Sequence, residues 1–134
     1  MNTETPFTRM LEARLSAPGR QTRVMRINAG SAVIVTPGGG RRRFAGAKAG
    51  TGDLVGYVAP EGWHLEVETK VDGARPRPAQ LRRREALDLA GCIYVVVRWY
   101  ESAGEALETA CRRAVAEVDA AIEQRRAASR GGSC

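Results

Sequence analysis

Acidic residues and a lysine recur at short spacing in the middle of the chain. Asp53 precedes a short apolar segment, and Glu66, Glu68 and Lys70 occupy alternate positions in "WHLEVETK". Residues two apart in a strand point to the same face, so the last three share a face if this segment is a strand. Burying three charged side chains is costly unless they are paired or bind a metal ion. The pattern therefore indicates either a metal site or an exposed strand face with an ordinary ion pair.

Asp53 and Glu68 supply the ligands that a hard divalent cation needs. Mg²⁺ is commonly held by one or two carboxylates together with water and phosphate oxygens. The two residues are 68 − 53 = 15 positions apart, which fits two strands joined at the turn "PEG". Lys70 beside them could stabilise charge on a phosphate or orient an attacking water. Only Lys48 and Lys70 are lysines among 21 basic residues, which suggests that position 70 needs a compact ammonium.

The elements that must position these residues follow from apolar periodicity and from glycine and proline. Phe7, Met10, Leu11 and Leu15 fall on one helical face. The continuous apolar run at 92–100 is typical of a strand in the middle of a sheet with both faces covered. The sequence predicts helices at 4–17, 76–91 and 102–127, one or two strands within 23–37, a basic glycine-rich loop at 41–52, a hairpin of strands at 53–60 and 63–70, and a strand at 92–100.

Length and composition favour one α/β domain with a mixed sheet. The chain has 134 residues, which we divide into a single domain over 1–128 and a disordered tail at 129–134. Its formal charge of +6 favours a polyanionic partner such as DNA. We see no signal peptide or apolar span and expect an intracellular protein with no membrane partner. Cys92 and Cys111 are read as small core residues, and the cysteine spacing does not fit a zinc site.

Four segments in unbroken order resemble a known nuclease domain. These are "RINAGSAVIV", "GTGDLVGYVAPEG", "WHLEVETKVDGARPRPAQ" and "GCIYVVVR", which together run from about Arg26 to Arg98. They are similar to the virus-type replication-repair nuclease (VRR-NUC) domain of the PD-(D/E)XK nuclease superfamily. The resemblance implies a central mixed β-sheet flanked by helices, and Mg²⁺- or Mn²⁺-dependent cleavage of DNA phosphodiesters.

The resemblance also implies site residues. Asp53 matches the metal-binding aspartate, Glu68 and Lys70 match the E-x-K element, and Gln80 matches the glutamine of the following helix. Glu68 is preferred to Glu66 because only Glu68 lies two residues before a lysine, which leaves Glu66 as an accessory or alternative metal carboxylate. The family's first helix often adds a glutamate, for which the candidates are Glu4, the nearer to the expected offset, and Glu12.

Basic residues around these motifs are candidate DNA contacts. In "RINAG", Arg26 and Asn28 either approach the substrate or form an ordinary turn with a surface arginine. His64 is expected in the hairpin without a catalytic part. The two arginine runs are candidate phosphate contacts or solvated faces, and they comprise Arg41, Arg42, Arg43, Arg82, Arg83 and Arg84.

The expected function is metal-dependent DNA endonuclease activity with Mg²⁺ or Mn²⁺ as cofactor. A small domain with one active site per chain would need a homodimer to act symmetrically on a branched DNA such as a Holliday junction. The alternative is a catalytically inactive DNA-binding module of the same fold. Metal-independent binding without cleavage would distinguish this alternative.

Overall fold

The computed structural model describes residues 5–27, 31–35, 37–45 and 49–131, with the backbone alone for 31–35 and 41–45. Glu4, Asn28 and Cys134 lie outside the described residues. The elements in chain order are α1 (Pro6–Leu15), β1 (Thr22–Arg26), β2 (Ser31–Val35), β3 (Arg41–Ala45), β4 (Leu54–Val58), β5 (Trp63–Val71), α2 (Pro78–Leu89), β6 (Ile93–Trp99), the 3₁₀ turn η1 (Glu101–Ala103) and α3 (Leu107–Gly131).

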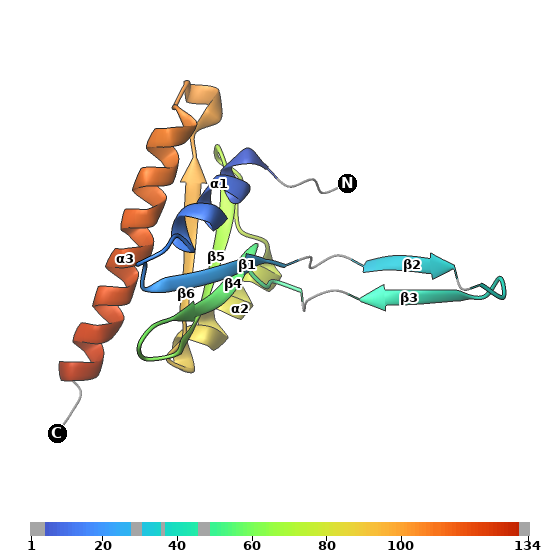
Figure 1. Ribbon diagram of the computed structural model, residues 1–134, viewed down its shortest axis with the longest axis horizontal. Helices are drawn as coiled ribbons and strands as arrows, with labels where there is room; N and C mark the ends of the chain where they lie inside the picture. Colours follow the sequence, from blue (N-terminus) through green and yellow to red (C-terminus); the bar gives the residue numbers. More distant parts are fainter. Residues whose placement is uncertain (1–4, 28–30, 36, 46–48, 132–134) are drawn as a thin grey trace.

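The main sheet has four strands in the order β1-β4-β5-β6. The β1–β4 and β4–β5 pairs are antiparallel, whereas β5 and β6 run parallel. Helix α2 makes the crossover that a parallel pair requires. Figure 1 shows β2 and β3 as a separate hairpin that projects from the body. The expected α/β architecture, a mixed sheet flanked by helices, is confirmed.

The two faces of β5 have different chemistry. Leu65 and Val67 are fully buried in a core that α1 and α3 complete. Glu66 and Glu68, the alternate residues, point to the opposite face, where side chains of α2 bind them. One layer of the protein is therefore an apolar core, and the layer on the other side of the sheet holds the buried carboxylates.

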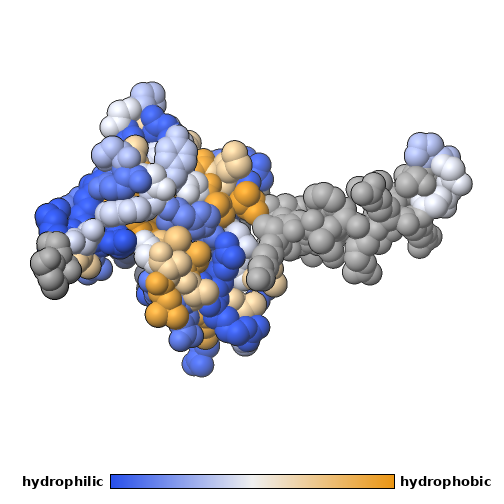
Figure 2. Space-filling model, turned by 90° about the horizontal axis from the view of Figure 1, so that it is seen from below, coloured by the Kyte–Doolittle hydropathy of each residue, from blue (hydrophilic) through white to orange (hydrophobic). Residues whose placement is uncertain are grey.

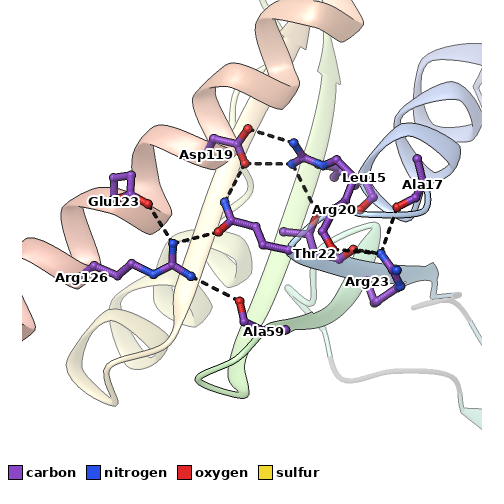
Figure 3. A network of polar contacts seen from close by, with 10 residues as sticks. Leu15, Ala17, Arg20, Thr22, Arg23, Ala59, Asp119, Glu123 and Arg126 are labelled. Carbon is purple, nitrogen blue, oxygen red and sulfur yellow. Dashed lines mark hydrogen bonds and ion pairs between the residues drawn. The ribbon is translucent and has the colours of Figure 1, made fainter.

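A network of arginines ties α3 to the rest of the body. Arg20 forms a bidentate pair with Asp119 of α3, with the shorter distance at 2.8 Å (Figure 3). Arg126 donates to Gln21 at 2.8 Å and to the carbonyl of Ala59 at 3.3 Å. These contacts attach the long helix to the α1–β1 turn and to the β4–β5 turn, so they fix the core layer rather than the carboxylate layer.

Two of the expected strand assignments were wrong. The basic segment expected as a loop contains the strand β3, which pairs with β2 from Val35↔Arg41 to Ser31↔Ala45. Three successive arginines hide the alternation of apolar and polar residues that marks a strand. The apolar strand β6 lies at the edge of the described sheet, not in its middle. Its run of apolar residues reflects cover from α2 and α3, which both contact it.

The helices were expected in the right places, with two differences. Leu81 and Leu89 of α2 are 53% and 84% exposed, and Gln80 is the buried residue of this helix. The inner face of α2 meets carboxylates, so a polar residue is the one that is buried there. Helix α3 runs from Leu107 to Gly131, whereas a helix over 102–127 was expected; residues 132–134 lie outside the described part.

Surface properties agree with a body whose apolar residues are mainly internal. The face in Figure 2 is largely hydrophilic, with apolar side chains gathered in separate patches. Cys111 is buried in the core as expected, whereas Cys92 is only half-buried. None of the described helices is long and apolar enough to cross a membrane.

Candidate active site

Glu68 is the centre of the carboxylate layer. Its side chain is buried, and its Oε2 accepts a hydrogen bond of 2.5 Å from Gln80 Nε2 and lies 3.3 Å from Lys70 Nζ. Its other oxygen, Oε1, is also buried but has no hydrogen-bond partner among the described residues. A buried carboxylate oxygen without a partner is costly. Glu68 therefore presents one fixed oxygen and one that is available for a ligand.

The environment of Glu68 disfavours its charged form. Burial and, second, the nearby charge of Asp53 raise the pKa of Glu68 to about 7, against the opposing effects of Lys70 and Gln80. A shift of this kind in a paired, buried carboxyl is typical of functional sites. A bound cation would offset the same penalty, because it compensates the negative charge that burial disfavours.

Asp53 immediately precedes β4 and reaches β5. Its Oδ2 accepts hydrogen bonds from Thr69 N at 2.8 Å and from Thr69 Oγ1 at 2.7 Å. Thr69 Oγ1 is in turn hydrogen-bonded at 2.7 Å to Thr8 Oγ1 of α1. The second oxygen of Asp53 makes none of these contacts. Thr8 and Thr69 were not anticipated from the sequence, because a threonine pair 61 residues apart carries no local signal.

Gln80 is oriented from both ends of its amide. Its Oε1 accepts from Arg77 N at 2.9 Å, while its Nε2 donates to Glu68. Pro78 begins α2, where the missing N–H of proline costs nothing. Three residues into a helix, a glutamine can turn back to the preceding backbone, so the first turn of α2 fixes the amide that holds Glu68.

Glu66 is fully occupied by contacts within the protein. Its Oε1 accepts from Gly52 N at 3.0 Å and Arg83 Nε at 3.2 Å. Its Oε2 accepts from Arg83 Nη2 at 2.6 Å and is 2.6 Å from His64 Nε2. Although burial acts in the opposite direction, Arg83, His64 and Gly52 together lower the pKa of Glu66. These contacts favour the accessory role for Glu66 over that of a metal ligand.

The loop before Asp53 is held closely against the site. Tyr94 of β6 donates from its hydroxyl to the carbonyl of Gly50 at 3.2 Å. Gly50 has φ +88°, and a Cβ there would lie 2.3 Å from the carbonyl oxygen of Ala79 in α2. Burial, followed by the charge of Glu68, raises the pKa of Tyr94. Tyr94 was missed from the sequence, where the only signal is one hydroxyl within an aliphatic strand.

Neither Glu4 nor Glu12 is assigned as the first-helix glutamate of the metal site. Glu12 accepts a hydrogen bond of 3.1 Å from Arg26 N and lies near the guanidinium of Arg26. Arg26 N is at the outer edge of β1, since the neighbouring Ile27 N donates to Asp53 O on the inner side. Glu12 therefore binds the backbone at the outer edge of the sheet. Glu4, the other candidate, and Asn28 lie outside the described residues.

The arginines of the two runs, which were candidate DNA contacts, differ in their surroundings. Arg83 is directed inward to Glu66, so its predicted role as a phosphate contact is replaced by a structural one. Arg84 lies 4.0 Å from Asp88 on the surface of α2, and Arg82 is exposed. The remaining candidates, Arg41, Arg42 and Arg43, belong to β3, of which the backbone alone is described.

The residues fit a divalent cation through two carboxylates. Asp53 and Glu68 are neighbours, and the unpartnered Oε1 of Glu68 is an available oxygen. Among the described residues there is no group of three or more acidic, histidine or cysteine side chains placed to hold a metal. Two carboxylates suffice for Mg²⁺ or Mn²⁺ when water and substrate oxygens complete the coordination.

Comparisons with known proteins give no relative. No family model, curated protein or solved structure matches this chain.

Proposed function

We propose that this protein is a Mg²⁺- or Mn²⁺-dependent DNA endonuclease of the VRR-NUC type within the PD-(D/E)XK superfamily. The observation that carries the proposal is the environment of Glu68, a neighbour of Asp53. One oxygen of Glu68 is bound by Lys70 and Gln80, and the other is buried without a partner among the described residues. A carboxylate pair with an adjacent ammonium matches the needs of phosphodiester hydrolysis.

Each side chain has a part in this reaction. Asp53 and Glu68 would hold the cation, which when bound activates water and polarises the phosphate. Lys70 stabilises the negative charge that develops on the phosphate as water adds, and Gln80 keeps Glu68 in position. One P–O bond breaks, the leaving oxygen takes a proton, and the products are a phosphate monoester and an alcohol.

The first test is substitution of the proposed metal ligand and of the lysine. Asp53→Asn and Lys70→Ala should each lower Mg²⁺- or Mn²⁺-dependent nicking by at least about 100-fold, because the first removes a charge that holds the cation and the second a charge that stabilises the phosphate. Asp88→Asn, on the exposed surface of α2, is the matched control and should keep full activity. Circular dichroism and thermal unfolding check that the fold is retained. Full activity in both site variants would refute the proposed mechanism.

A catalytically inactive DNA-binding module is the second candidate. The observation that favours it is that the described residues bring together two carboxylates and not three. This candidate predicts DNA binding that survives EDTA and no nicking with Mn²⁺. Nicking that requires Asp53 would exclude it.

We propose a structure-selective substrate, and the small size of the domain supports this proposal. One small active site cuts one strand, so symmetric cleavage of a Holliday junction or another branched DNA calls for a homodimer. We propose this as the substrate class and assembly of the enzyme.

A further inference from the structure

The turn between β5 and α2, residues 72–77, is held unusually firmly. Asp72 has φ +56°, the one positive φ among the described non-glycine residues. Its N–H donates to Trp99 O at 2.8 Å, and its Oδ1 accepts from both N and Oγ of Ser102 at 2.8 Å. A left-handed conformation outside glycine costs about 1 kcal/mol or more and persists where surrounding contacts enforce it.

The guanidinium of Arg98 also holds this turn in place. Arg98 of β6 is the register partner of Lys70 on β5. Its Nη1 donates to the carbonyls of Asp72 at 3.0 Å and Ala74 at 2.6 Å. The first part of the turn, from Asp72 to Ala74, is therefore attached to the edge strand β6. The other end is held by α2, because the backbone N–H of Arg77 donates to the side chain of Gln80.

This turn presents arginines that have no acidic partner. Arg75 and Arg77 are exposed, and neither forms an ion pair within the described part of the chain; the same holds for Arg82 on the first turns of α2. On the opposite layer several arginines are paired with carboxylates on or next to α3, as in Arg14–Glu108, Arg20–Asp119 and Arg113–Glu105. Uncompensated positive charge is thus found on the side of the candidate active site.

The arginines are close to the proposed reaction centre. The backbone N–H of Arg77 donates to Gln80, whose amide donates to Glu68. The backbone of Arg77 is therefore linked to the carboxylate of Glu68 through two hydrogen bonds, and Arg75 lies in the same turn. Guanidinium groups bind phosphate oxygens with two parallel hydrogen bonds, which suits this position.

We propose that residues 72–77 form a preorganised phosphate clamp, in which Arg75 and Arg77 bind backbone phosphates of the DNA next to the phosphate that is cut. This inference rests on the proposed nuclease function and adds the surface that positions its substrate. A rigid turn makes the clamp effective because little conformational entropy is lost when the DNA binds.

The charge of the clamp is tested by the salt dependence of DNA binding. In EDTA, where no cleavage occurs, Arg75→Gln and Arg77→Gln should each weaken binding to a labelled duplex about 5- to 10-fold in 0.1 M salt. Each should lower the slope of log affinity against log salt by about 0.9. Arg112→Gln removes the same charge from α3, where the side chain is 72% exposed, and should change neither quantity appreciably. An unchanged slope in both clamp variants overturns the proposal.

The rigidity of the clamp is tested with two variants of equal charge. Asp72→Asn and Asp72→Ala both remove a negative charge near the DNA, which by itself strengthens binding. Asparagine tolerates the left-handed conformation and can still accept from Ser102, so binding should be equal or tighter. Alanine loses both properties, so binding should weaken several-fold. Tighter binding by both variants overturns preorganisation.

The clamp and the nuclease proposals fail in different ways. Normal salt slopes for the arginine variants in a protein that nicks DNA with Mn²⁺ reject the clamp alone. Reduced slopes in a protein that never nicks DNA support the clamp and reject the nuclease. Absence of DNA binding by the unaltered chain rejects both.

Discussion

Glu68 combines two properties that ordinary surface carboxylates lack. It is buried next to Asp53, and only one of its oxygens is bound by residues that the structure describes. Both properties raise the free energy of the ionised form when no cation is present. The residue therefore makes the metal-free protein less stable at neutral pH than it would be with a neutral side chain at this position.

This instability gives a pH-dependent prediction. In the unfolded chain Glu68 ionises near its usual pKa of 4.5, whereas in the folded chain burial raises the pKa to about 7. Between these values the folded state holds a proton that the unfolded state has lost. The free energy of unfolding therefore falls as pH rises through this window. In the Glu68→Gln variant this side chain cannot ionise, so its titration no longer lowers the free energy of unfolding as pH rises.

The expected outcome is a stability gap that depends on pH. We compare the free energy of unfolding of Glu68→Gln with that of the unaltered protein, measured with urea in EDTA. The difference should change by about 2 kcal/mol in favour of the variant between pH 5 and pH 8. Other titrating groups are shared by both proteins and cancel in the comparison. Parallel stability curves over this range would contradict the assigned environment of Glu68.

At the scale of elements, the loop before β4 is positioned by steric fit as well as by hydrogen bonds. Gly50→Ala would place a Cβ against the carbonyl oxygen of Ala79, so the loop must move away from α2. The contacts of Gly52 with Glu66 and of Gly50 with Tyr94 would weaken with it. Because Asp53 follows this loop, its position should change too.

Gly50→Ala should therefore lower Mn²⁺ affinity about 10-fold, as measured by isothermal titration calorimetry, with a moderate loss of stability. Gly19→Ala is the matched control, since Gly19 has φ +84° but open space around a Cβ. The Gly19→Ala variant should lose only about 1 kcal/mol of unfolding free energy to backbone strain, and it should bind Mn²⁺ normally. Equal metal affinity in the two variants would show that the loop does not position Asp53.

The helices and the β4–β5 hairpin could be predicted because their signals are local. Apolar spacing marks α1, and alternation along β5 separates Leu65 and Val67 from Glu66 and Glu68. The spacing of the charged residues also predicted Asp53, Glu68 and Lys70 as candidates, and the structure places them together with Gln80. The edge position of β6 could not be predicted, because covering by two helix layers gives the same apolar run as a central strand.

Other contacts depend on long-range geometry that no local pattern reveals. Glu66 and Arg83 are 17 residues apart, and their pairing requires the crossover of α2 to set one over the other. The arginine run "LRRRE" gave no indication that its second arginine turns inward. The link from Thr8 to Asp53 through Thr69 likewise exists only because α1 lies beside β5.

For the whole molecule, charge pairing differs between the two layers. Arginines on the α1 and α3 side mostly bind carboxylates, whereas Arg75, Arg77 and Arg82 do not within the described residues. Arginines without a carboxylate partner among the described residues therefore lie on the side of the candidate active site. Polyanions should approach that side first, and the approach should slow as salt rises.

Substrate choice and assembly are tested together at this scale. With Mn²⁺, a four-way junction should be cleaved at least about 10-fold faster than a linear duplex of the same sequence, since a dimer presents two active sites related by symmetry. Light scattering coupled to size-exclusion chromatography should give twice the 14.5 kDa chain mass. A monomer that cleaves junctions and duplexes equally would remove the junction-resolving proposal while leaving the nuclease proposal intact.

The β2–β3 hairpin leaves and rejoins the body at nearly one point, because Ile27 N donates to Asp53 O at 3.0 Å across β1 and β4 (Figure 1). An insertion attached in this way is topologically independent of the sheet that carries it. Its length and sequence can change through evolution without disturbing the strand pairing of β1 with β4. The fold therefore separates the carboxylate layer of the body from a hairpin that can be exchanged, shortened or recharged without altering that layer.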